Sequence, residues 1–270
     1  MAGVAEPLNV GAVAYHPHVV TIWDAFAAWF AARDSPVRPI LFDSYDDQLD
    51  ALFLGDIDVA WNTNLAYVEA QRRASGGCDM LAMRDNDRDW RSHLVVRDDS
   101  DARGLADLAG KRIGLASSDS PQATILPVYF MQQEGFDPDR DAKAERLEID
   151  LGKHGDTGGA ERKQLARLVR GEIDAAVLAD ATCAGAFDAD TVDGVGLRRV
   201  WTTPPYHHCN FTVLPGHDAH ASAGFRNGLM AMSSVDPAVA DAMRDEWVGR
   251  WVEGDEDGYA ALYDALAVPR

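Results

Sequence analysis

Apolar and polar residues along the first quarter of the chain change between strand-like and helix-like spacing. Residues 8–14 are almost continuously apolar, whereas the apolar positions in residues 19–33 recur every three or four residues. Gly55 follows the second helical stretch and is a common helix terminator. The pattern predicts strands over residues 8–14, 38–43 and 57–61, and helices over residues 19–33, 46–54 and 63–73. Strands and helices in this alternating order predict a mostly parallel sheet covered by helices.

The rest of the chain continues the same alternation of strand and helix patterns. Strands are predicted over residues 78–83, 92–97, 113–116, 147–151, 173–178, 197–202 and 210–214. Helices are predicted over residues 122–134, 160–170, 219–232, 236–251 and 257–266, with a short helix and turn over residues 105–111. Four aromatic residues of the first long helix share one face and are predicted to lie in the core, namely Trp23, Phe26, Trp29 and Phe30.

Two segments of the chain carry nearly the same sequence. Residues 52–60 read LFLGDIDVA, and residues 168–176 read LVRGEIDAA. Each copy follows an apolar strand, a short polar loop and an amphipathic helix. This duplication predicts two similar α/β lobes that face each other across a cleft, where small molecules commonly bind.

The chain is predicted to cross between the two lobes twice, near residues 92–97 and 204–214, and these two crossings would form a hinge. We therefore expect residues 1–94 and 208–270 to form a discontinuous lobe one and residues 95–207 to form lobe two. The predicted function is to close on a small molecule.

The charge of the chain excludes some partners. It has 25 basic and 44 acidic residues, for a formal net charge of −19. Such a surface repels the phosphate backbone of nucleic acids and anionic membranes. An anionic small ligand remains compatible with this charge, because helix N-termini attract anions locally.

The cysteines and the first residues of the sequence bear on where the protein resides. Three cysteines, Cys78, Cys183 and Cys209, form no disulfide pattern and fit a reducing compartment or one incidental bridge. The first ten residues show no secretory signal, and no stretch of about 18 apolar residues is present. The sequence as written predicts a cytoplasmic protein without membrane insertion. A removed leader would instead place it in the periplasm or outside the cell, with an ABC permease as partner.

Four segments resemble one known family. They are residues 45–52 followed by 55–61, residues 105–112, residues 120–127 and residues 171–176. The chain is similar in these segments to the phosphate, phosphite and phosphonate substrate-binding proteins of the type II periplasmic-binding-protein fold. The resemblance covers most of the chain. It implies an α/β fold of two lobes, each with a mostly parallel sheet flanked by helices, and a protein that binds a small polar or anionic ligand.

The anion site implied by the resemblance is altered in this chain. The anion site of the family resembles a Ser-Thr-Ser-Gly run at the start of the first helix of lobe two. At the matching position this chain reads Ser120-Pro121-Gln122-Ala123, with Asp119 beside it. Two of three hydroxyls are absent, and a carboxylate at this point repels a phosphonate. We therefore expect the ligand to differ from a simple phosphonate.

Two loops of lobe two supply candidate ligand contacts. Asp119, Ser120 and Gln122 lie at a strand-to-helix turn, where Ser and Pro are also ordinary capping residues. The glycine-rich loop 153–159 contains three further candidates, His154, Asp156 and Thr157. Glycines let a backbone approach a ligand closely. The alternative for this loop is a plain turn capped by Asp156 or Thr157.

Lobe one supplies candidates at the ends of its first and third strands. Tyr15 and His16 lie in the first strand-to-helix loop, and Trp61, Asn62 and Thr63 end the third strand. Aromatic and amide groups there could stack on a ligand and form hydrogen bonds to it. The alternative for Asn62 and Thr63 is capping of the next helix.

The segment Tyr206-His207-His208-Cys209-Asn210 follows a Pro-Pro break. Strand alternation would place His208 and Asn210 on one face and His207 and Cys209 on the other. Tyr206 and His208 are candidate ligand contacts. No cofactor is certain from the sequence, but a divalent transition metal is one hypothesis, with ligands among His154, Asp156, His208 and Cys209.

Two functions from different classes follow from these residues. The first is a binding protein that closes its cleft on a small polar or anionic molecule. The second is a cytosolic enzyme on the same fold, of lyase, decarboxylase or biosynthetic type. In that case His154 or His208 would be the general acid or base, with a carboxylate such as Asp119 or Asp156 orienting it and a metal as a further option. The sequence predicts neither the ligand nor the oligomeric state.

Overall fold

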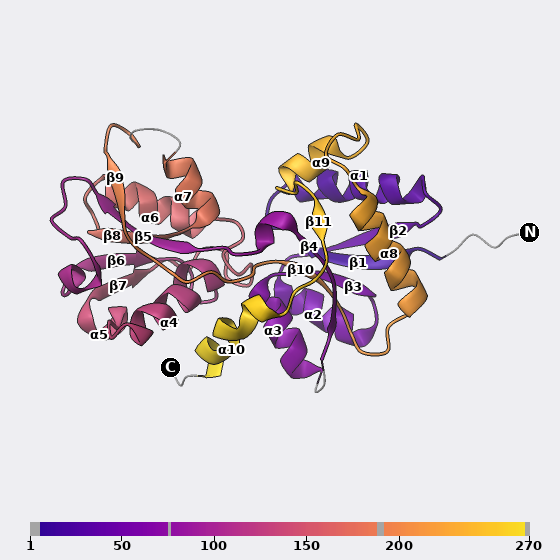
Figure 1. Ribbon diagram of the computed structural model, residues 1–270, viewed down its shortest axis with the longest axis horizontal. Coiled ribbons are helices and arrows are strands. Elements are labelled where there is room, and N and C mark those ends of the chain that lie inside the picture. The colour runs from indigo at the N-terminus through magenta and orange to yellow at the C-terminus, as the bar shows by residue number, and fades with distance from the viewer. Residues whose placement is uncertain (1–5, 75–76, 188–191, 268–270) are drawn as a thin grey trace, which may run out of the picture. The chain divides into compact units, whose positions relative to one another are not determined.

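The computed structural model describes residues 6–74, 77–187 and 192–267, and it divides the chain into two compact units (Figure 1). Unit 1 comprises Met1–Asp89 and His207–Ala260, and unit 2 comprises Trp90–Tyr206 and Ala261–Arg270. Residues 90–94 and 261–270, which the sequence assigned to lobe one, belong to unit 2. No helix in the described residues combines the length and the apolar character needed to cross a membrane.

Unit 1 is built on a mixed sheet. Its strand order is β11-β4-β10-β3-β1-β2, with β11 at Trp251–Val252, β4 at Asp79–Arg84, β10 at Asn210–Val213, β3 at Val59–Asn62, β1 at Leu8–Val13 and β2 at Val37–Phe42. Strand β1 pairs in parallel with β2 and β3, whereas β10 and β11 pair antiparallel with their neighbours. Its helices are α1 at Val19–Ala31, α2 at Tyr45–Leu54, α3 at Asn64–Arg73, α8 at Ala219–Ala231 and α9 at Ala240–Asp245.

Unit 2 repeats this plan with a second mixed sheet. Its strand order is β7-β6-β8-β5-β9, with β7 at Lys143–Arg146, β6 at Arg112–Leu115, β8 at Ala175–Ala179, β5 at Ser92–Arg97 and β9 at Leu197–Thr202. Strand β6 pairs in parallel with β7 and β8, and β5 pairs antiparallel with β8 and β9. Its helices are α4 at Leu126–Gln133, α5 at Pro138–Asp141, α6 at Gly159–Val169, α7 at Asp180–Phe187 and α10 at Ala260–Ala267.

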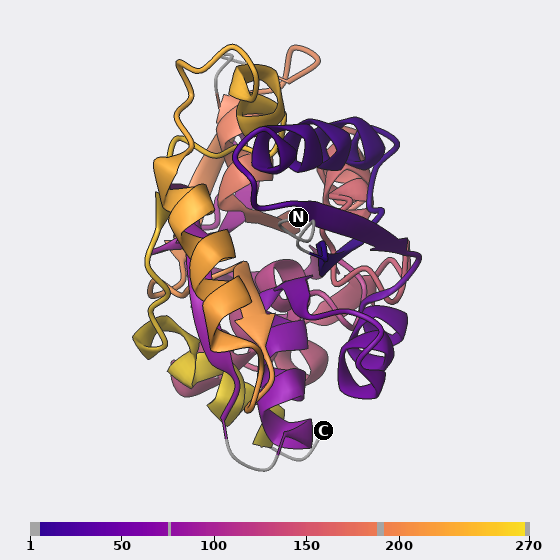
Figure 2. The ribbon, with the colours of Figure 1, turned by 90° about the vertical axis from the view of Figure 1, so that its right-hand side faces the viewer.

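Aromatic side chains dominate the core of unit 1. The four aromatic residues predicted from the spacing of the first long helix are all buried, at 1–4% exposure. Phe30 of α1 stacks on Phe225 of α8 at 5.1 Å, so helices from opposite ends of the sequence pack together (Figure 2). Burying side chains of this size contributes about 1.5–3 kcal/mol each.

Local sequence signals explain several helix ends. The Ser44 hydroxyl accepts a hydrogen bond from the Asp47 amide at the start of α2, and Gly55 ends that helix with a φ of +79°. Thr63 caps α3 by accepting from the Ala66 amide at 3.2 Å. In unit 2, Ser120 caps a π-helical turn, Pro121–Ile125, that leads into α4. These are ordinary capping arrangements.

Three sequence predictions are wrong. The sheets are mixed rather than mostly parallel, because the return strands β5 and β10 run antiparallel to their neighbours. The strand predicted over residues 147–151 is instead β7, Lys143–Arg146, because its partner β6 ends at Leu115. The helix predicted over residues 236–251 is only α9, and the positive φ of +58° at Trp247 breaks it before β11.

Candidate functional site

Three predicted site residues of unit 2 converge on one loop. The Asp119 carboxylate accepts hydrogen bonds from the backbone amides of Gly152 at 2.7 Å and His154 at 3.4 Å. The Gln122 amide donates to the His154 carbonyl oxygen at 3.1 Å. Asp119 therefore fixes the position of the loop, in addition to any role toward a ligand.

Gly155 is required for this contact between the turn and the loop. Its φ is +77°, a conformation that favours glycine. A Cβ at this position would lie 2.4 Å from Ser120 Oγ and 2.8 Å from Gln122 Nε2. The preceding residue, His154, is 7% exposed and also has a positive φ, of +50°. The glycine-rich loop thus achieves the close backbone approach that the sequence predicts, but toward the protein's own turn.

Four side-chain oxygens at this turn are buried and have no hydrogen-bond partner in the described residues. They are Ser117 Oγ, Asp119 Oδ1, Gln122 Oε1 and Thr124 Oγ1. Leaving a buried polar group unpaired costs about 1–3 kcal/mol. A polar molecule bound at the turn could satisfy these atoms, which include two acceptor-only oxygens and two hydroxyls.

Tyr206 belongs to the same polar cluster. Its hydroxyl lies 2.7 Å from Ser92 Oγ, and the Ser92 hydroxyl donates to the Gln122 carbonyl oxygen. Burial raises the pKa of Tyr206 well above its ordinary range, so its hydroxyl stays protonated. Tyr206 is 2% exposed, and it supports the backbone of the turn through Ser92.

Asp156 and Thr157 complete the loop before α6. The Thr157 hydroxyl accepts from the Gly159 amide at 3.1 Å, and the Asp156 amide donates to the Lys153 carbonyl oxygen at 3.0 Å. Thr157 thus forms the local turn contact that the sequence allowed as an alternative. The cap residue of α6 is Gly158, which has no side-chain hydrogen bond.

In unit 1, two predicted ligand contacts bind a glutamate of the protein itself. Tyr15 donates to one Glu246 carboxylate oxygen at 2.9 Å, and the Trp61 indole donates to the other at 3.2 Å. Trp61 is 3% exposed, and its ring packs against Phe211 and Trp251 in the core. These side chains position Glu246, a residue that no sequence motif marks.

Glu246 and Asp87 share the buried guanidinium of Arg84. Arg84 Nε and Nη2 each lie 2.7 Å from an oxygen of Asp87, and Arg84 Nη1 lies 2.9 Å from the Glu246 carbonyl and 3.5 Å from its carboxylate. Burial alone would lower the pKa of Arg84 and raise that of Asp87. Their attraction reverses both effects, and it lowers the pKa of Asp87 to about 2.

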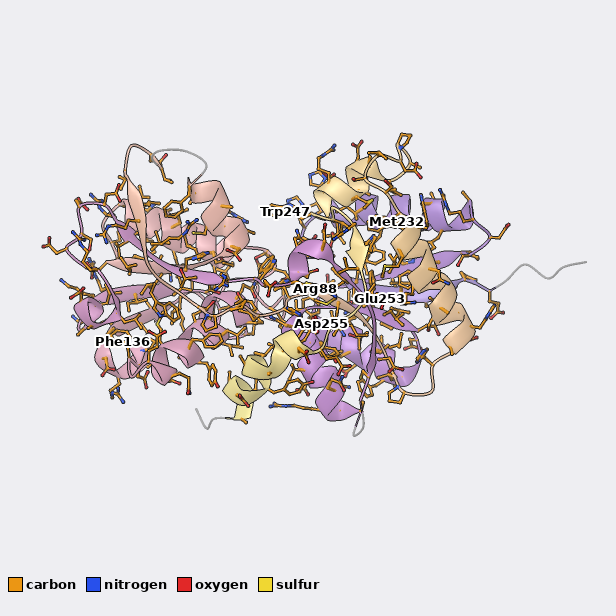
Figure 3. All side chains as sticks on the ribbon, in the orientation of Figure 1. Arg88, Phe136, Met232, Trp247, Glu253 and Asp255 are labelled. Carbon is orange, nitrogen blue, oxygen red and sulfur yellow. The ribbon has the colours of Figure 1, made fainter. Side chains whose placement is uncertain are left out.

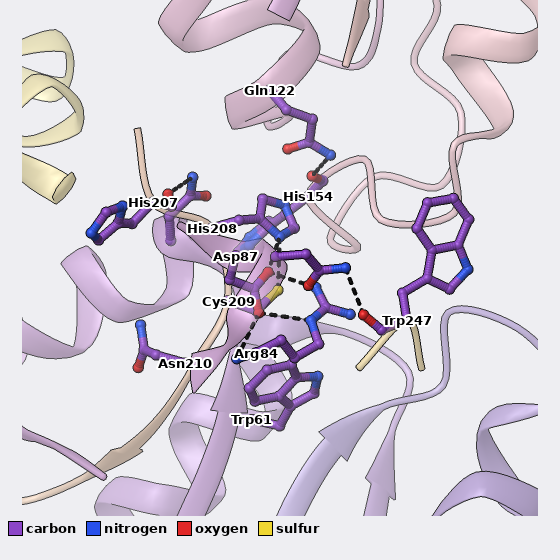
Figure 4. Close-up of polar contacts among 12 residues, drawn as sticks. Trp61, Arg84, Asp87, Gln122, His154, His207, His208, Cys209, Asn210 and Trp247 are labelled. Atoms are coloured by element: carbon purple, nitrogen blue, oxygen red, sulfur yellow. Dashed lines mark hydrogen bonds and ion pairs between the residues drawn. The ribbon is translucent and has the colours of Figure 1, made fainter. Parts of the chain in front are cut away.

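His208 and Cys209 lie beside this ion pair (Figure 4). The Cys209 sulfur is 2.9 Å from His208 Nδ1, and His208 Nδ1 is 3.5 Å from Asp87 Oδ1. The predicted alternation of faces is wrong here, because β10 begins only at Asn210 and both side chains turn toward Asp87. The structure groups His208 and Cys209 with Asp87, whereas the other two predicted metal ligands, His154 and Asp156, belong to unit 2.

The remaining predicted residues of unit 1 have separate environments. Asn62 is fully buried, donates to the Thr212 hydroxyl at 3.0 Å and accepts from Gln48 at 2.8 Å. Thr63 caps α3, which is the alternative the sequence left open. His16 is exposed, and its ring stacks on that of His18 at 4.9 Å. The ligand-binding and catalytic roles predicted for all these residues stay predictions.

A further polar group of unit 1 lies near the same chain segment. His207 Nε2 is 3.4 Å from an Asp255 oxygen, and Arg88 donates to the Glu253 carbonyl oxygen at 2.7 Å. Figure 3 labels Arg88, Glu253 and Asp255 in this part of unit 1. His207 is 7% exposed, so this pair holds the segment before β10 against residues 253–258. His207 and His208 thus point to different partners.

Comparisons with known proteins agree with the fold and with one family. A family model for the periplasmic phosphonate substrate-binding protein of ABC transporters matches residues 11–259. The probable ABC transporter phosphite binding protein PhnD1 of Prochlorococcus marinus (strain MIT 9301) is 24% identical over 183 residues, which are 66% of this chain and 58% of that protein. The match therefore spans less than two thirds of that relative.

Solved structures show the same architecture at low sequence identity. PhnD1 from Prochlorococcus marinus (MIT 9301), in complex with methylphosphonate, has a TM-score of 0.73 with 18% identity over 96% of both chains. A binding protein component of an ABC phosphonate transporter from Pseudomonas aeruginosa has a TM-score of 0.67 with 14% identity, over 97% of this chain and 86% of that one.

The two sheets and their flanking helices define a two-lobed protein of the type II periplasmic-binding-protein class. Within that class, the chain belongs to the family of phosphonate substrate-binding proteins of ABC transporters. The family match, which covers nearly the whole chain, confirms the resemblance seen in the sequence.

Proposed function

We propose that this protein is the substrate-binding component of an ABC importer, and that its ligand is a small anion that also carries a hydrogen-bond donor. The family match supports the transport role. One observation supports the ligand class, namely the buried, unpaired acceptor oxygens of Asp119 and Gln122 at the turn of unit 2.

The anionic part of such a ligand would find donors at the same turn. Ser117 and Thr124 have buried hydroxyls without partners in the described residues, and the π-helical turn that leads into α4 begins beside them at Pro121. A helix N-terminus stabilises a negative charge by about 0.3–1 kcal/mol. The relatives whose names mention phosphite and methylphosphonate make a phosphorus oxyanion the first group to test.

The Asp119 carboxylate separates this proposal from binding of a simple phosphonate. Two like charges about 4 Å apart repel by about 4 kcal/mol at the effective dielectric typical of a protein surface. An ammonium or hydroxyl group on the ligand would instead donate to Asp119 Oδ1 and Gln122 Oε1. An aminoalkylphosphonate carries both an oxyanion and an ammonium group, whereas methylphosphonate and phosphite carry no ammonium group.

Isothermal titration calorimetry with two matched ligands tests this proposal. We expect the wild-type protein to bind 2-aminoethylphosphonate at least tenfold more tightly than methylphosphonate. Asp119→Asn removes the carboxylate and should weaken 2-aminoethylphosphonate by about tenfold while strengthening methylphosphonate. The control Asp101→Asn changes an exposed carboxylate of the same unit and should alter neither affinity. A wild-type preference for methylphosphonate, or an Asp119→Asn variant with unchanged selectivity, would contradict the proposed ligand class.

The transport role carries two further expectations. The family is described as periplasmic, so we propose the periplasm as the site of action and an ABC permease as the partner. Closure of the two lobes on the ligand stays a prediction. The alternative of a cytosolic lyase or decarboxylase receives no support from the comparisons, and we do not propose it.

A further inference from the structure

A second cluster of ligand atoms lies in unit 1, apart from the turn that the proposed function uses. Asp87, His208 and Cys209 each offer one possible metal-ligand atom, and these atoms lie within 4.8 Å of one another. The three residues are 0–3% exposed. A carboxylate oxygen, an imidazole nitrogen and a thiolate are the donors that Zn²⁺ takes in proteins.

The backbone around these side chains is held in place before any ion binds. The His208 amide donates to the Asp87 carbonyl oxygen at 2.9 Å, which joins the two ligand-bearing segments directly. The Tyr259 hydroxyl donates to the His208 carbonyl oxygen at 3.2 Å, and the Asn210 amide donates to the Tyr259 hydroxyl at 3.0 Å. A site built on fixed segments loses little conformational entropy when it binds an ion.

Hydrogen bonding leaves Asp87 one position for a ligand, and that position faces His208. Asp87 Oδ2 accepts from the Arg84 backbone amide at 3.2 Å and from Arg84 Nε at 2.7 Å, which occupies both of its lone pairs. Asp87 Oδ1 accepts from Arg84 Nη2 at 2.7 Å, and its second lone pair faces His208 Nδ1 at 3.5 Å, so an ion bound there would take the place of the contact with His208. Arg84 would then be the outer partner that orients a metal-bound carboxylate.

The buried charges of the cluster also favour a divalent cation. Two carboxylates, on Asp87 and Glu246, lie against the single guanidinium of Arg84 in a buried site. A Zn²⁺ ion with Cys209 bound as thiolate adds one net positive charge. The four residues and the ion together would then be neutral, which is the condition under which buried charges are tolerated.

The geometry points to a Zn²⁺ site in which Asp87 Oδ1, His208 Nδ1 and Cys209 Sγ are the protein ligands, independent of the ligand proposed above. In a tetrahedral site the sulfur and nitrogen ligands lie about 3.5 Å apart, given Zn–S and Zn–N bonds of about 2.3 and 2.0 Å. Cys209 Sγ and His208 Nδ1 are 2.9 Å apart. An ion that replaced the proton between them would therefore need this distance to increase by about 0.6 Å. The fourth position would hold a water molecule.

Cobalt substitution tests the site through the thiolate itself. Wild-type protein is stripped with a chelator and titrated with Co²⁺, which gives a thiolate-to-cobalt charge-transfer absorption only when sulfur is bound. We expect this absorption to saturate at one equivalent and to be abolished by one equivalent of Zn²⁺. Zn²⁺ at 100-fold above its dissociation constant should also raise the Tm by about 5 °C.

Three variants separate this site from adventitious metal binding. Cys209→Ser and Cys209→Ala should each abolish the absorption, and His208→Ala should weaken Co²⁺ binding at least tenfold. Cys183→Ser is the control, because Cys183 is also a buried free cysteine, and its sulfur accepts from Arg199 Nε at 3.2 Å. A wild-type titration with no charge-transfer absorption would overturn the proposal, whether or not the variants fold. Absorption that persists in both Cys209 variants would overturn it as well.

Discussion

The buried ion pair between Arg84 and Asp87 makes a quantitative prediction about stability. The exposed fractions of the two side chains are 11% and 0%, and two short hydrogen bonds join them. Asp87→Asn keeps the shape of the side chain but replaces the carboxylate by a neutral amide, while the Arg84 guanidinium stays buried. Removing one partner of a buried pair costs about 3–5 kcal/mol. Glu246 still contacts Arg84, so we expect the lower end, about 3 kcal/mol.

Urea unfolding in the presence of EDTA measures this cost without a contribution from bound metal. Tryptophan fluorescence is a suitable signal, because Trp61 and Trp251 pack beside the ion pair. The control Asp50→Asn breaks the Arg73–Asp50 pair of the same unit, in which the two side chains are 32% and 65% exposed. An exposed pair contributes about 0–1 kcal/mol. If Asp87→Asn cost no more than this control, the buried pair would not stabilise the unit as argued.

The same pair predicts a pH dependence. The pKa of Asp87 is lowered from 3.8 to about 2 in the folded protein, so its ionised form is the one that folding favours. A lowered pKa adds stability that is complete above the ordinary pKa and is lost as the pH falls toward the folded value. The shift corresponds to about 2 kcal/mol. The difference in free energy of unfolding between wild type and Asp87→Asn should therefore shrink by about 2 kcal/mol between pH 5 and pH 2, and a constant difference would refute the assignment.

Two further predictions concern the glycine-rich loop and a buried thiol. Gly155→Ala should destabilise the protein by about 3 kcal/mol and weaken ligand binding, because its Cβ would clash with Ser120 and Gln122 at a positive φ. Gly185→Ala, at a helical glycine with open space, is its control in thermal unfolding, and equal effects would contradict the role of the loop. Burial and two nearby carboxylates raise the pKa of Cys78 to about 11, so Cys78 should resist alkylation at pH 8 in the folded protein and react in urea. Mass spectrometry of the modified peptides checks this, and rapid native labelling would contradict it.

Periodicity and capping signals predicted most of the fold because they are local. Strands over residues 92–97 and 197–202 have the predicted bounds, and Ser120 and Gly55 act as the predicted helix signals. The strand expected over residues 147–151 failed because strand ends depend on the partner strand. Leu147 and Ile149 still pack against the core, so their alternation reports burial rather than a strand.

Candidate site residues could be predicted only where they lie in recognisable turns. Asp119, Gln122 and His154 were found as candidates, and the structure joins them through the backbone of one loop. Arg84 and Glu246 were missed, because they are separated by 162 positions and each lies in a segment without a motif. Only the tertiary fold brings such charges together, so a single sequence cannot reveal their pairing.

Competition between two ligands, followed by native mass spectrometry, decides whether the ligand combines an oxyanion with a hydrogen-bond donor. The protein is unfolded, dialysed, refolded and mixed with equal concentrations of methylphosphonate and 2-aminoethylphosphonate. We expect a one-to-one complex with the mass of 2-aminoethylphosphonate. A complex with methylphosphonate, or no complex with either, would contradict it.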